Sequence, residues 1–207
     1  MLDILREGGV TVIPLLICSI VGLAVSLERL IYLKKAKGNN FRLIEKVKLK
    51  LNRGKINEVS EIISQESGVI AGILEEGIKY YGQEKQELRS NLEIVGQTEI
   101  KKMEKRLGVL DLIATIAPLL GLLGTVLGII DSFNILAGAQ GMASPSALSS
   151  GIAQALISTA LGLVVAIPTM LVYTYLLGLI QDRIDEINRC FVDLVELLGQ
   201  GGNDVQV

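Results

Sequence analysis

Two threonines that stand among apolar residues are the side chains of this chain with the clearest chemical use. Thr125 lies within APLLGLLGTVLGIIDS, and Thr159 lies within GIAQALISTALGL. A hydroxyl both donates and accepts hydrogen bonds, so hydroxyls and amides gathered in an apolar region can support a path for ions. We therefore predict a polar path, and the residues assigned to it are Thr125, Thr159, Gln154 and Ser158.

Other interpretations of the same threonines stay open at the level of sequence. A threonine in a membrane helix commonly donates its hydroxyl to a carbonyl of its own helix, or holds two helices together without lining a path. Thr125 and Thr159 fall at matched depths of two antiparallel apolar segments, and this pairing favours a shared path more than a lone threonine would.

The segments that must position these residues are apolar enough to cross a membrane. Half of the 207 residues are hydrophobic, and the mean hydropathy is +0.49, which is unusual for a soluble domain. Residues 8–27, 112–130 and 132–181 carry no charge. Because about 20 apolar residues span the hydrocarbon layer, we predict an all-α integral membrane protein with three transmembrane helices.

Small residues follow one face of the second and the third apolar segment. They recur every three to four residues, as Ala117, Gly121, Thr125, Gly128 and Ser132, and again as Gly151, Ala155, Thr159, Gly162 and Ala166. Such faces let helix backbones approach closely in a bilayer. Two such faces offer more packing surface than one protomer can use, so we predict a homo-oligomer. The residues assigned to helix packing are Gly121, Gly124, Gly128, Gly151, Gly162, Pro118 and Pro168.

Lysines indicate which side of the membrane each end occupies. Lys34, Lys35 and Lys37 follow the first apolar segment, whereas Arg6 alone precedes it. By the positive-inside rule the N-terminus is outside, and the large loop and the C-terminus are cytoplasmic. The predicted organisation is transmembrane helix 1 in 1–33, a cytoplasmic helical segment in 34–110, transmembrane helix 2 in 111–137, an outer loop in 138–144, transmembrane helix 3 in 145–181 and a cytoplasmic tail in 182–207.

Long cytoplasmic helical extensions are predicted for the second and the third helix. The three-to-four spacing of apolar residues from Leu92 through Met103 and Leu107 continues into Ala117, and no turn residue interrupts it. One helix should therefore run through 92–125. The amphipathic stretch that follows Asp182 should pack against this extension.

Nothing in the sequence is typical of an enzyme, and we predict no catalytic residue, cofactor or metal. Histidine is absent, which removes the usual zinc ligand and proton shuttle. No Asp, Glu, Lys or Arg lies well inside the three apolar runs, so an ion path would need an ionisable group from a partner. The net charge of +5 over 34–110 fits the anionic headgroups of a lipid membrane, and we predict no nucleic acid partner.

Three stretches resemble a known family. APLLGLLGTVLGIIDSF and GIAQALISTALGLVVAIPTMLVY look like the second and third membrane helices of the MotA/TolQ/ExbB proton-channel family, and SLERLIYL is similar to the segment at the end of the first. Three crossings with a small loop domain are more like ExbB or TolQ than the flagellar stator protein. The resemblance implies a pentameric ring in the bacterial inner (plasma) membrane, in which Thr125 and Thr159 match pore-lining threonines and Pro118 and Pro168 match family prolines.

The resemblance also implies partners and a function. Such rings enclose a small single-span protein of the ExbD/TolR type, whose intramembrane aspartate carries protons, and the proton motive force then drives transport or envelope work, with a TonB- or TolA-like protein as a further partner. This chain has Gln154 where the family commonly has a glutamate, and glutamine cannot ionise. The expected function is a proton-channel and motor subunit. The alternative is a structural membrane scaffold subunit without ion conduction.

Overall fold

The computed structural model describes residues 9–36, 40–51, 55–66, 68–81, 84–138 and 145–199, and every regular element in these ranges is an α-helix. The chain divides into two compact units. Met1–Glu28 and Arg106–Tyr175 form the first, called here the membrane unit, and Arg29–Lys105 and Leu176–Val207 form the second, called the amphipathic unit. The predicted outer loop, residues 139–144, and the end of the predicted tail, residues 200–207, lie outside the described residues.

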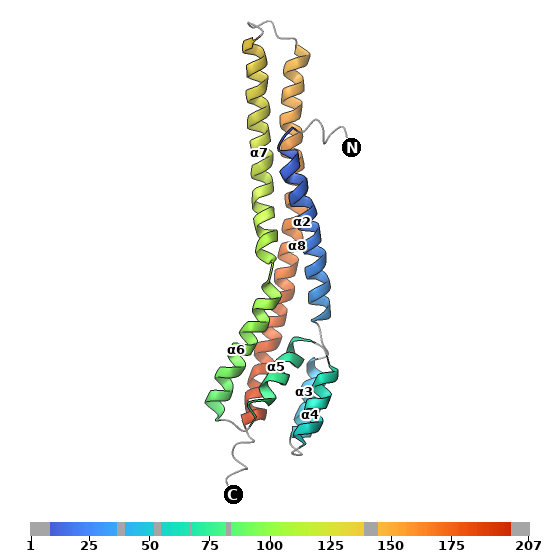
Figure 1. The fold of residues 1–207 in the computed structure, drawn as a ribbon, viewed down its shortest axis with the longest axis vertical. Helices are drawn as coiled ribbons and strands as arrows, with labels where there is room; N and C mark the ends of the chain where they lie inside the picture. Colours follow the sequence, from blue (N-terminus) through green and yellow to red (C-terminus); the bar gives the residue numbers. More distant parts are fainter. Residues whose placement is uncertain are drawn as a thin grey trace. The chain divides into compact units, whose positions relative to one another are not determined.

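The membrane unit is built from the first part of α2 (Val12–Lys35), α7 (Leu107–Gly138) and the first part of α8 (Pro145–Gly199), which lie side by side (Figure 1). Pro14 falls in the first turn of α2 and Pro145 is the first residue of α8, positions at which a proline removes no intrahelical hydrogen bond. Among the described residues, three helical runs are long and apolar enough to cross a membrane, which agrees with the predicted number of crossings.

Apolar side chains face outward over much of the membrane unit. Its small core joins Leu15, Ala117 and Ala166, whereas Leu122 is 56% exposed and Val164 is 66% exposed. In water such an arrangement would forgo most of the free energy of burial, at about 25 cal/mol per Å² of apolar surface. The arrangement therefore suits a lipid environment, and this chain is a membrane protein.

The amphipathic unit contains α3 (Asn40–Leu51), α4 (Ile56–Gln65), α5 (Val69–Ile78), α6 (Lys85–Glu104) and the last part of α8. Each of the helices α3 to α6 buries one apolar stripe. The fully buried side chains include Val47, Val59, Leu74, Leu92 and Leu194. The predicted packing of the tail on the 92–110 region is present, because a groove between α6 and α8 is lined by Gly96 and Ile100 on one side and by Ile184 and Ile187 on the other.

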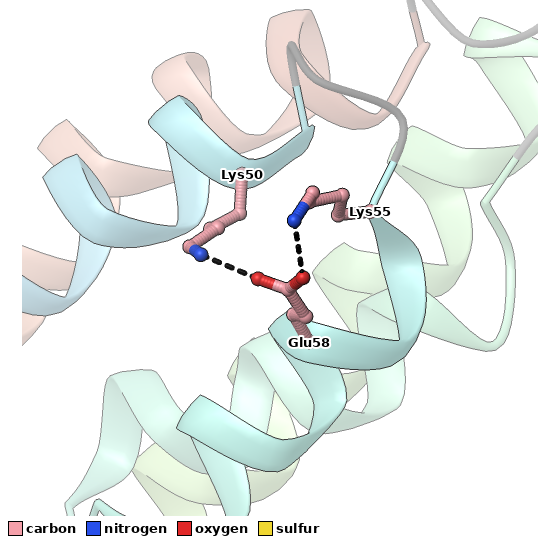
Figure 2. Close-up of polar contacts among 3 residues, drawn as sticks. All are labelled: Lys50, Lys55 and Glu58. Atoms are coloured by element: carbon pink, nitrogen blue, oxygen red, sulfur yellow. Dashed lines mark hydrogen bonds and ion pairs between the residues drawn. The ribbon is translucent and has the colours of Figure 1, made fainter.

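An ion cluster joins α3 to α4. The Glu58 carboxylate accepts hydrogen bonds from the ammonium groups of Lys50 and Lys55, as Figure 2 shows. These two hydrogen bonds lower the pKa of Glu58 from 4.5 to about 2. The cluster therefore stays ionised at any physiological pH.

The helix predicted to run unbroken through 92–125 is interrupted in the structure. α6 ends at Glu104 and α7 begins at Leu107, because Lys105 leaves the helical region (φ −51°, ψ 133°) and Arg106 has φ 67°. Side-chain contacts accompany the break. The Arg106 guanidinium pairs with the Glu28 carboxylate, and Arg29 donates to the carbonyl of Lys102 at 3.2 Å, in the last turn of α6. Helical periodicity could not reveal the break, since the apolar spacing continues across it.

Candidate functional site

Thr125 of α7 and Thr159 of α8 share a hydrogen bond between their hydroxyl oxygens. Thr125 Oγ1 also lies 3.1 Å from the Ala155 carbonyl, and both hydroxyls lie 3.3 Å from the Gly121 carbonyl. The pair thus bonds its own helices and bridges between them. Both threonines are half-buried, so part of the pair remains accessible at the surface of the protein.

The two hydroxyls can form their hydrogen bonds in either of two donor–acceptor orders. In one arrangement Thr159 donates to Thr125, and Thr125 donates to the Ala155 carbonyl. In the other, Thr125 donates to Thr159, and Thr159 donates to the Gly121 carbonyl. Because each arrangement leaves no hydroxyl proton without an acceptor, the direction of the two O–H groups can reverse without moving a helix.

Glycines bring α7 and α8 close enough for these bonds. A Cβ added to Gly121 would lie 2.9 Å from the Ser158 carbonyl oxygen, and one added to Gly162 would lie 2.6 Å from the Ala117 carbonyl oxygen. Gly128 faces Ala155 and the Gly151 carbonyl, each 3.0 Å from the added Cβ. These glycines are buried between helices of one chain. The two small faces therefore pack against each other within one chain, and they do not by themselves require a second protomer, contrary to the expectation from their number.

Ser158 is buried in a contact of three helices rather than exposed. Its side chain is 1% exposed and lies against Gly124, and its hydroxyl donates to the Gln154 carbonyl at 3.2 Å. The Thr11 hydroxyl, just before α2, approaches Ser158 Oγ at 3.4 Å. Within one chain the structure thus gives Ser158 a packing position, although a polar path was predicted for it. Thr11 could not be predicted as a contact of Ser158, because its only signal in the sequence is its place three residues before Pro14.

Gln154 lies one turn before Ser158 and on the same side of α8. Its side-chain amide lies against Gly9, which has φ 73°, so a side chain at position 9 would meet the amide. Gln154 is half-buried. The structure therefore brings Gln154 and Ser158 to the start of α2, and it brings Thr125 and Thr159 together at the α7–α8 contact.

The two membrane-helix prolines have different surroundings. Pro118 is half-buried in α7 and Pro168 is exposed in α8. A proline leaves the carbonyl four residues earlier without its helical partner, which for Pro168 is the carbonyl of Val164. Val164 and Pro168 line a groove of about 200 Å³ together with the hydroxyl residues Ser19, Ser26 and Thr169. Gly151, the remaining packing residue, is buried against Ser132 of α7.

Ionisable groups lie at the ends of the apolar runs. Asp111 and Asp131 flank the uncharged run of α7 and are exposed, and Glu28 follows the uncharged run of α2. No group of three or more His, Cys, Asp or Glu side chains that could hold a metal occurs among the described residues. Cys190 belongs to α8 by its backbone, while its side chain lies outside what is described.

The sequence profile of the MotA/TolQ/ExbB proton channel family matches residues 65–189. A putative biopolymer transport protein ExbB homolog of Methanothermobacter thermautotrophicus is 36% identical over 187 residues, which is 90% of this chain and 66% of that protein. A putative biopolymer transport protein ExbB-like 3 of Synechocystis sp. is 33% identical over 189 residues, covering 87% of this chain and 90% of the relative.

A shorter match reaches a protein of a different named system. The Tol-Pal system protein TolQ of Haemophilus influenzae is 44% identical over 78 residues, which is 38% of this chain and 34% of that protein. The chain spans slightly less than two thirds of the Methanothermobacter relative and about one third of this TolQ protein.

Proposed function

Because this chain belongs to the MotA/TolQ/ExbB proton channel family, we propose that it is the proton-channel and motor subunit of an ExbB/TolQ-type complex in the inner (plasma) membrane. The family is one of transport and energy transduction and not of enzymes. In the proposed complex, protons driven by the proton motive force pass along a path that this chain lines and a partner completes, and the work is transport or maintenance of the envelope.

The observation that carries this proposal is a reversible hydroxyl pair in an uncharged membrane span. Thr125 and Thr159 can direct their O–H groups either way, and Asp, Glu, Lys and Arg are absent from residues 112–130 and 132–181. Hydroxyls can pass a proton along or hold water that does so, but they cannot store a charge at neutral pH. The chain therefore needs an ionisable group from a partner.

The partner we propose is a single-span ExbD/TolR-like protein with an intramembrane aspartate, seated in a pore formed by a homopentamer of this chain. A TonB- or TolA-like protein is a further candidate partner on the outer side. Gln154, which replaces a common family glutamate, leaves the aspartate of the partner as the proton carrier. Oligomer mass in a mild detergent tests this arrangement, and a monodisperse monomer would contradict it.

The functional test of the hydroxyl pair is proton flux into liposomes that contain this chain and a candidate single-span partner. Thr125→Val and Thr159→Val keep the side-chain shape and remove one hydroxyl each, so each should reduce the flux several-fold while the complex still assembles. Thr174→Val is the matched control, because Thr174 of α8 is exposed and bonds only the Met170 carbonyl of its own helix, at 2.9 Å. Unchanged flux in both threonine variants would remove the pair from the path.

A structural scaffold is the second candidate, and one observation favours it. The small faces of α7 and α8 are buried against each other within one chain, as interhelical packing alone would require. The same variants separate the two functions, because both accounts expect Thr→Val to lower stability, whereas only a scaffold predicts that the proton flux through the surviving protein is unchanged.

A further inference from the structure

The positive charge of the polar segment is concentrated directly after the first membrane helix. Residues 34–55 contain nine Lys or Arg and one Asp or Glu, whereas residues 56–110 contain seven and ten. The first stretch thus has a net charge of +8 and the second of −3. A basic cluster immediately beside a transmembrane helix is the usual pattern for attraction to anionic lipid headgroups.

In helix α3 the exposed charged residues and the buried apolar residues lie on opposite sides. Leu43, Val47 and Leu51 are 3%, 0% and 6% exposed and form the inner stripe. The opposite face, called here the basic face, consists of Arg42, Lys46, Lys48 and Leu49, and all four side chains are exposed. Glu45 is also exposed on this face and lowers its net charge to +2. Leu49 is 57% exposed and lies three residues after Lys46 and seven after Arg42, so the leucine shares their side of the helix.

Two of the nearby lysines already share one carboxylate. Glu58 holds Lys50 and Lys55 in the ion cluster of Figure 2, and these lysines join α3 to α4. Lys46 lies 3.7 Å from Glu66, a separation at which an exposed pair contributes little. Among the described residues, Arg42 and Lys48 form no ion pair. The basic face therefore retains charge that the protein itself does not compensate.

Chain length limits how far α3 can lie from the end of α2. α2 ends at Lys35 and α3 begins at Asn40, so the five intervening steps of backbone can span at most about 18 Å. Lys34 and Lys35 are exposed in the last turn of α2 and mark the end of that crossing. An outward leucine between cations, held at this distance, suits the boundary between headgroups and acyl chains.

We propose that α3 is a lipid-binding helix, whose basic face of Arg42, Lys46, Lys48 and Leu49 lies against anionic phospholipid headgroups while Leu43, Val47 and Leu51 face the protein. The cations bind the phosphates, and the leucine enters the layer between headgroups and acyl chains. This contact would fix the amphipathic unit at the membrane surface and make it sensitive to the lipid composition of the leaflet.

Because the sequence contains no tryptophan, the emission of one introduced tryptophan reports on the surroundings of its own position. Leu49→Trp in the full chain introduces a single tryptophan at the centre of the basic face. Two vesicle preparations share one composition of phosphatidylcholine and phosphatidylglycerol, and they differ only in which lipid carries brominated acyl chains. Ile94→Trp is the matched control, because Ile94 is 61% exposed on α6 of the same unit.

The proposal predicts that brominated phosphatidylglycerol lowers Leu49→Trp emission roughly two-fold and that brominated phosphatidylcholine lowers it much less, since anionic lipid gathers under the cations. Ile94→Trp should not respond to either. Adding Arg42→Glu and Lys48→Glu should abolish the preference, whereas Lys85→Glu and Arg89→Glu on α6, an equal change in charge, should leave it intact.

Three outcomes would overturn the proposal. The first is Leu49→Trp emission that neither brominated lipid quenches. The second is quenching that follows only the mole fraction of each lipid, which would mean contact without recognition of charge. The third is Leu49→Trp emission that shifts with the protein-to-lipid ratio and not with bromination, because a second copy of the chain would then cover the basic face.

Discussion

At the scale of single residues, Thr125 and Thr159 contribute to stability as well as to the proposed path, because their hydroxyls bond across α7 and α8. Each Thr→Val change should lower the free energy of unfolding by roughly 0.6–2 kcal/mol, the range for interhelical hydrogen bonds in membranes. The double variant should lose less than the sum, since the two side chains share one bond. Denaturant unfolding in detergent of the unmodified chain, the two single variants and the double variant measures these losses. Strict additivity of the two single losses would contradict the pairing.

A substitution at Gly162 tests how closely α7 and α8 approach each other. Gly162→Ala places a methyl group 2.6 Å from the Ala117 carbonyl oxygen and 3.0 Å from Gly121 Cα, so the backbones must separate. We expect a loss of about 1–3 kcal/mol, as for overpacked cores. Gly178→Ala on the same helix is the control, because nothing lies within 4 Å of the added carbon. There the greater helix propensity of alanine should be neutral or stabilising by up to about 1 kcal/mol. Equal effects at both positions would contradict the packing.

The lowered pKa of Glu58, which lies outside the membrane helices, predicts that the protein loses stability in acid. Its pKa is lowered from 4.5 to about 2 by hydrogen bonds from Lys50 and then Lys55. Because the folded-state pKa is depressed, the contribution of Glu58 to stability is complete above pH 4.5 and is lost as the pH falls toward 2. A carboxyl-carbon NMR titration of the full chain should give a midpoint near 2, and Lys50→Gln should move this midpoint upward. A midpoint of 4.5 in the unmodified chain would contradict the cluster.

At the scale of elements, the break between α6 and α7 is the feature that sequence reasoning could least provide. Arg106 has φ 67°, a left-handed conformation that costs a non-glycine residue roughly 1–2 kcal/mol. Arg106→Gly and Arg106→Ala both remove the ion pair with Glu28, and only glycine also relieves the backbone. The glycine variant should therefore have the higher melting temperature of the two. A more stable alanine variant would mean that the helix runs through position 106.

The three crossings could be predicted because they depend on long uncharged runs, and the close approach of α7 and α8 could be anticipated from glycine spacing. The sequence could not show that the two small faces pack against each other within one chain, since periodicity identifies a face and not its partner. It also could not place Ser158 against Thr11, because the contact joins residues 147 positions apart. Burial of Ser158 is a property of three helices together.

At the scale of the whole molecule, membership of the family supports an energy-transducing role of the ExbB/TolQ type, while the glycine faces no longer provide a reason for an oligomer. The glycine faces are occupied within one chain, so contacts between protomers must use the outward apolar faces, which include Leu122, Val126 and Leu163. These side chains suit lipid and a neighbouring helix equally. The pentamer therefore remains a proposal that rests on the family.

The central claim is that this chain lines a proton path and takes its ionisable group from a partner. Proton flux under an imposed membrane potential should be compared for three kinds of liposome: with this chain alone, with the chain and a single-span partner, and with the partner carrying Asp→Asn. We predict flux only in the second, because the spans of this chain contain no carboxylate. Equal flux from the chain alone, or flux that survives Asp→Asn, would contradict the claim.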